Sequence, residues 1–126
     1  MKEYIDNWLQ RLNRKEKIPS DIIALNFGLF KIDKGYCIYL IGSKHYDEDN
    51  DDWACDNDFE PEEKYLKITS NNIGNMSWDK FQHNVIQIVT DYISANRNKQ
   101  SIVFNKIVTV GFDDGNLVRC IPYYQD

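Results

Sequence analysis

The sequence predicts one α+β domain, residues 1–126, in which a mostly antiparallel sheet of about five strands carries one long helix on a face and a short N-terminal helix. Two segments repeat apolar residues at helical spacing. Between and after them lie short runs rich in β-branched and aromatic residues. Turn sequences of the type Asp-Lys-Gly and Asp-Asp-Gly-Asn join two pairs of these runs, which indicates hairpins.

The first third of the chain predicts a helix followed by a hairpin. Residues 2–14 form the helix, because apolar residues recur every three or four positions at Tyr4, Ile5, Trp8, Leu9 and Leu12. Pro19 prevents its extension. Residues 22–32 and 36–42 form strands joined by a tight turn, in which Gly35 can adopt a positive φ. Both strands are apolar at nearly every position, so we expect both faces of this hairpin to be covered and the hairpin to be central in the sheet.

The second half predicts a short strand, the long helix and a second hairpin. Residues 64–69 form a strand beside the first hairpin or at an edge, and residues 70–75 form a turn. Ser77 is the expected N-cap of a helix that runs to about Asn96. Its buried stripe should comprise Trp78, Phe81, Val85, Ile88, Val89 and Tyr92. Residues 101–112 and 117–121 then pair through a turn at 113–116.

Composition and charge exclude some classes of function and favour others. At 126 residues and 42% hydrophobic content, the chain can bury a core without disulfides or metals. Its net charge of −5 argues against a nucleic-acid partner, which requires clustered Lys and Arg, and favours a basic partner or cations. The three cysteines are widely spaced, the N-terminus does not resemble a signal peptide, and no apolar run could span a bilayer. We therefore expect a cytoplasmic protein that does not bind membranes.

The most unusual feature is the segment of residues 46–63, here called the acidic segment. It holds ten of the 20 Asp and Glu residues and no Lys or Arg. Trp53, Cys55 and Phe59 lie among these carboxylates, whereas a solvated linker has little use for large aromatic residues. The sequence therefore predicts an ordered acidic loop.

Aromatic anchors surrounded by charge are typical of a protein-binding surface, where the charge speeds encounter and selects the partner. We predict that this surface binds a basic protein. Trp53 would act either as an apolar anchor or as a pin that holds the loop on the core, and Phe59 likewise. The predicted partner-binding residues are Asp47, Glu48, Asp49, Asp51, Asp52, Trp53, Asp56, Asp58 and Phe59.

The alternative is a calcium-binding module that uses residues 47–58. Asp47, Asp49, Asp51 and Asp58 occupy positions 1, 3, 5 and 12 of an EF-hand-like pattern. Position 6, which should be Gly, is Asp52, and position 12 lacks the bidentate Glu.

Other chemistry has weaker support. His45, Cys55 and His83 lack the close ligand pairs of zinc sites, and Cys37 and Cys120 are expected to be small hydrophobic residues in strands. Carboxylates around Cys55 would disfavour its thiolate. No nucleophile or phosphate-binding motif occurs, and so many acids could supply any spacing that a carboxylate pair carries no information. We expect no enzyme activity and no cofactor.

Two stretches carry a resemblance to a known family. The amphipathic N-terminal helix followed by IPSDIIALNFGLFKIDKGYCIYLIGSKHYD, and then DDWACDNDFEPEEKYLKI, resembles small acidic immunity proteins of bacterial polymorphic-toxin and contact-dependent-inhibition systems. The resemblance covers roughly the first half of the chain. It implies an antitoxin that binds one cognate toxin domain, often a basic nuclease, and blocks its active site. It carries over no catalytic residue, and only residues 47–58 as a partner site.

Overall fold

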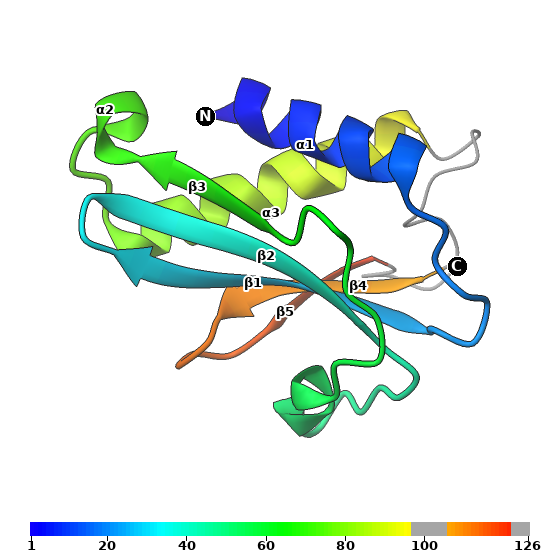
Figure 1. Cartoon of the computed structure of the whole chain (residues 1–126). Coiled ribbons are helices and arrows are strands. Elements are labelled where there is room, and N and C mark those ends of the chain that lie inside the picture. Colours follow the sequence, from blue (N-terminus) through cyan, green and yellow to red (C-terminus); the bar gives the residue numbers. More distant parts are fainter. Residues whose placement is uncertain (97–105, 122–126) are drawn as a thin grey trace.

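The computed structural model describes residues 1–96 and 106–121 and has the α+β fold expected from the sequence (Figure 1). The elements in chain order are α1 (Lys2–Lys15), β1 (Ala24–Ile32), β2 (Gly35–Ser43), the 3-10 helix η1 (Asp51–Cys55), β3 (Tyr65–Thr69), α2 (Ser70–Ile73), α3 (Trp78–Ala95), β4 (Ile107–Phe112) and β5 (Val118–Ile121). The strand predicted over residues 101–112 is confirmed from Ile107 onward, and residues 101–105 lie outside the described part.

The five strands form one sheet in the order β3-β2-β1-β4-β5. β1 pairs antiparallel with β2 over its whole length, and β3 and β5 continue the antiparallel pattern at the two edges. β1 and β4 are parallel, from the pair Ala24 and Ile107 to the pair Leu29 and Phe112. A parallel pair needs a long crossover connection, and the segment that contains α3 provides it.

Helices α1 and α3 lie together on one face of the sheet (Figure 1). The hydrophobic core fills the space between these helices and the sheet. Trp8 of α1 meets Phe27 of β1 edge to face at 5.9 Å, and Tyr36 of β2 stacks on Phe81 of α3 at 4.3 Å. Such aromatic pairs add to the stabilisation from burial alone. The helices are therefore anchored to the central strands by large rings.

The opposite face of the sheet is covered in part by the chain itself. Figure 1 shows η1 on the side of the sheet away from α1 and α3. On this face of the sheet, the side chains of Asn26 and Thr109 are buried. The Thr109 hydroxyl donates a 2.8 Å hydrogen bond to Oδ1 of Asn26. Cys37 and Ile41 are also buried. The prediction that β1 and β2 are covered on both faces is confirmed, and the acidic segment contributes to the second cover.

Two local predictions differ from the structure, and a third, the N-cap at Ser77, is confirmed in position but without the side-chain hydrogen bond of a cap. The turn predicted over residues 70–75 contains the one-turn helix α2. Ser77 is the N-cap residue of α3, but its hydroxyl donates to Asp79 and does not accept from the helix backbone. Trp78 was predicted in the buried stripe and is 60% exposed, although its ring meets Phe112 of β4 edge to face. Ile93 is buried at the other end of α3, and Tyr92 is partly buried.

Candidate protein-binding surface

The neck of the acidic segment is closed by hydrogen bonds to the end of β2. The Gly42 amide donates to the Phe59 carbonyl oxygen at 2.7 Å, and the amides of Asp58 and Phe59 donate to the Gly42 carbonyl oxygen at 3.0 and 3.1 Å. Oδ2 of Asp58 also accepts from the Lys44 amide at 2.9 Å. The residues between these points form a compact loop whose ends are fixed against the sheet.

Trp53 fixes the middle of the loop. Its side chain is only 5% exposed and meets the Tyr46 ring edge to face at 5.2 Å. The guanidinium of Arg119 in β5 lies over the Tyr46 ring, 5.4 Å from its centre. Nη1 of Arg119 is 3.5 Å from Oε2 of Glu48. Of the two roles expected for Trp53, burial supports the pin and not the exposed anchor.

Short-range turns shape the chain around Trp53. Oδ1 of Asp47 accepts from the Asp49 amide, and Oδ1 of Asn50 accepts from the Asp52 amide at the start of η1, both at 2.9 Å. Asp and Asn commonly stabilise turns and helix starts in this way. Oδ2 of Asp51 reaches further and accepts from the Leu117 amide at 3.1 Å, which ties η1 to the loop between β4 and β5. These contacts fix the shape of the loop.

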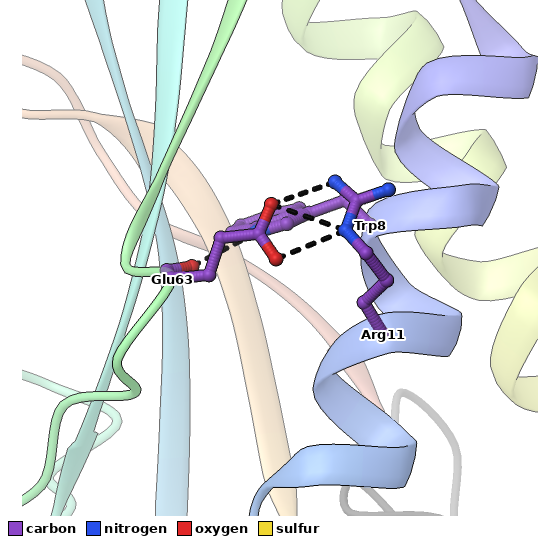
Figure 2. Close-up of polar contacts among 3 residues, drawn as sticks. All are labelled: Trp8, Arg11 and Glu63. Atoms are coloured by element: carbon purple, nitrogen blue, oxygen red, sulfur yellow. Dashed lines mark hydrogen bonds and ion pairs between the residues drawn. The ribbon is translucent and has the colours of Figure 1, made fainter.

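The far end of the acidic segment is attached to α1. Figure 2 shows the Arg11 guanidinium donating to both carboxylate oxygens of Glu63, at distances of 2.7–3.2 Å. Beside it, the Trp8 indole N–H donates to the Glu63 carbonyl oxygen at 2.9 Å. The hydrogen bonds from Arg11 lower the pKa of the Glu63 carboxyl. This end of the segment is therefore structural.

The carboxylates divide into paired and unpaired groups. Glu48, Glu60 and Glu63 form ion pairs with Arg119, Lys64 and Arg11. Within the described residues, the other seven carboxylates of the acidic segment have no ion pair, and all seven are exposed. Five of them lie on the loop itself: Asp47, Asp49, Asp51, Asp52 and Asp56. Asp58 lies at the neck of the loop, and Glu62 lies beyond it. The structure thus brings the predicted acidic residues together on one ordered loop, with Asp58 exposed at its neck and Phe59 half-buried against the core.

The loop geometry gives no support to the calcium alternative. The oxygens of Asp47, Asp51 and Asp58 accept hydrogen bonds from three different backbone amides. In residues 1–96 and 106–121, no group of three or more His, Cys, Asp and Glu side chains is arranged to hold a metal ion. His45, Cys55 and His83 are exposed and belong to no such group.

The other two cysteines are buried in the sheet, as expected. Burial raises the pKa of the Cys120 thiol to about 11 and also raises the pKa of Cys37. Thiols of this kind are unreactive near neutral pH.

The sequence did not indicate the residues that hold the loop in place. Arg119 and Leu117 are brought to it by the fold, and their separation from it along the chain gives no sign of this. Arg119 interrupts the apolar pattern of β5 with a cation, which is the one visible signal.

Comparison with protein-family models, curated proteins and solved structures found no match to this chain. The resemblance to immunity proteins therefore stays a prediction. No helix among the described residues has both the length and the apolar character needed to cross a membrane.

Proposed function

We propose that this chain is a non-enzymatic protein-binding domain that binds a basic partner protein through the acidic segment. The observation that carries the proposal is the set of five exposed carboxylates without ion pairs, held on a loop that is pinned by Trp53. Keeping like charges close together lowers stability, so a folded loop that concentrates them indicates a use for the charge.

The order of the loop supports binding as much as its charge does. A surface that is already fixed loses less conformational entropy when a partner docks. The hydrogen bonds at the neck and the contact between Asp51 and Leu117 fix the carboxylates before encounter. Complementary charge also accelerates association by steering the approach of a cationic surface.

Within this class, we propose an immunity protein that neutralises a basic toxin domain. The support is the resemblance of the first half of the chain together with the ordered acidic loop. In this role, Asp47, Asp49 and Asp52 would pair with Lys or Arg near the toxin's active site and exclude its substrate. Trp53 would hold the loop and would not contact the toxin.

Co-expression tests this proposal, with the protein encoded by the reading frame immediately upstream as the first candidate toxin. Cells that produce a toxic partner should grow when the wild-type chain is present. The triple variant Asp49→Asn, Asp51→Asn, Asp52→Asn should lose this protection, whereas the control Glu3→Gln, Asp33→Asn, Asp91→Asn should keep it. Both triples remove three exposed negative charges, so they separate the loop from net charge.

One result would contradict the proposal, and another would show that the growth assay reports folding and not binding. Equal protection by the two triple variants would exclude a role for the loop. Loss of protection by the loop variant together with a lower melting temperature than the control would show a folding defect, and the growth result would then not support binding by the loop.

A further inference from the structure

A second surface feature lies next to the acidic segment. A groove of about 840 Å³ opens between the start of α3, the end of β1 and the turn that joins β4 to β5. Apolar and aromatic side chains form most of its wall, which includes Leu29, Phe30, Tyr36, Trp78, Phe112 and Val118. Figure 1 shows the β4–β5 turn on the same lower side of the molecule as η1.

Two large apolar side chains that line the groove are exposed to solvent. Trp78 is 60% exposed and Val118 is 39% exposed, although both border the buried ring of Phe112. Trp78 meets Phe112 edge to face at 5.9 Å, so one side of its indole is held and the rest lies open to the groove. Exposed aromatic residues beside a pocket are typical of the centre of a binding surface.

The charges around the groove favour a cationic ligand. Asp113 and Asp114 line it on the turn, and Asp114 has no ion pair within the described part of the chain. The Tyr39 hydroxyl donates to Oδ1 of Asp113 and holds this carboxylate in place. Among the described lining residues, Lys31 is the one cationic side chain, and its ammonium lies near the carbonyl oxygens of Ile32 and Gly35.

The groove and the acidic segment are joined by one hydrogen bond. Asp51 of η1 accepts from the Leu117 amide at 3.1 Å, and Leu117 lies between two lining residues, Asn116 and Val118. The loop between β4 and β5 therefore contacts the acidic segment and also lines the groove.

We propose that the groove receives one aromatic side chain of the basic partner, flanked in the partner's sequence by Lys or Arg. The aromatic ring packs against Trp78 and Phe112, while the flanking cations face Asp113, Asp114 and the acidic segment. This assignment rests on the proposed function and supplies the apolar anchor that buried Trp53 does not provide.

Peptide titration followed by ¹H–¹⁵N NMR tests the proposal. The probes are acetyl-KKFKK-amide, acetyl-KKGKK-amide and acetyl-EEFEE-amide. The first should shift the Trp78 indole and the Val118 amide saturably, and it should bind about tenfold more tightly than the peptide without the ring. Trp78→Ala should abolish this difference, Trp78→Phe should restore most of it, and Tyr4→Ala, which removes an exposed ring on α1, should leave it unchanged.

The outcomes separate this inference from the proposed function. Equal affinity for the first two peptides, with shifts confined to residues 47–58, would overturn the groove assignment and leave the acidic loop as a cation-binding surface. Shifts in neither region would contradict both. Equal groove shifts with acetyl-EEFEE-amide would overturn the requirement for flanking cations. Groove shifts that depend on protein concentration without peptide would identify a second copy of this chain as the occupant and overturn the proposal.

Discussion

Replacing Trp53 by alanine should release the acidic segment from the sheet. The side chain is 5% exposed, and a tryptophan buries on the order of 150–250 Å². At roughly 25 cal/mol per Å², this burial corresponds to about 4–6 kcal/mol as an upper value. Because the loop can detach while the helices stay packed on the other face, we expect the free energy of unfolding to fall by about 2–3 kcal/mol.

Chemical denaturation and hydrogen exchange measure the two parts of this effect. Denaturation gives the global change, and exchange at the Gly42 and Asp58 amides reports the closed neck of the loop. Because the loop then opens locally, these amides should become less protected than the core amides, whose protection falls by no more than the global change, roughly 30- to 150-fold. The matched control is Trp78→Ala, which should change stability by less than about 1 kcal/mol because that ring is 60% exposed.

Equal effects of the two tryptophan substitutions would refute this reasoning. Unchanged protection at the loop neck in Trp53→Ala would likewise show that the loop is held by its hydrogen bonds and not by the buried indole.

Three further predictions concern the scaffold. The pKa of Glu63 lies below its ordinary value of 4.5, so its pairing with Arg11 stabilises the fold above about pH 4.5 and is lost as pH falls through the folded pKa. Both side chains are about one-third exposed, so Glu63→Gln should reduce stability by about 0.5–1 kcal/mol at pH 7 in urea titrations, with the difference vanishing in acid. Gly28→Ala would place a Cβ 2.0 Å from the Tyr39 ring and should lower the melting temperature, with a loss of about 1–3 kcal/mol; an unchanged melting temperature would contradict this close packing. A thiol reagent should label Cys55 in the folded protein and the two buried cysteines only after unfolding, and more than one label before unfolding would contradict the described burial.

The sequence predicted the elements well where one physical pattern dominates. The apolar spacing from Ile5 to Leu12 could form an amphipathic helix, and α1 begins and ends within about a residue of the expected limits. The apolar strands on either side of Gly35 predicted the central hairpin, and this glycine has a φ of +132°. These features depend on local spacing and turn chemistry, which the sequence contains directly.

Features that depend on distant contacts could not be predicted in the same way. The parallel pairing of β1 with β4 depends on how the segment containing α3 crosses the sheet. Trp78 fits the helical stripe by spacing, but its ring, which meets Phe112 edge to face, is 60% exposed. The roles open for Trp53 were distinguished only by its burial and by the position of the Tyr46 ring against it. Long-range packing overrides a pattern of local spacing at these positions.

The rate of association with a basic partner at low and high salt tests the central claim most directly. The claim is that the unpaired carboxylates of the acidic segment steer that partner. By stopped-flow measurement, the variant Asp49→Asn, Asp51→Asn, Asp52→Asn should associate about tenfold or more slowly than wild type at low salt and at nearly the same rate near 1 M salt. The control Glu3→Gln, Asp33→Asn, Asp91→Asn should be slowed much less. An unchanged rate for the loop variant at low salt, or equal slowing by the two triples, would contradict the account.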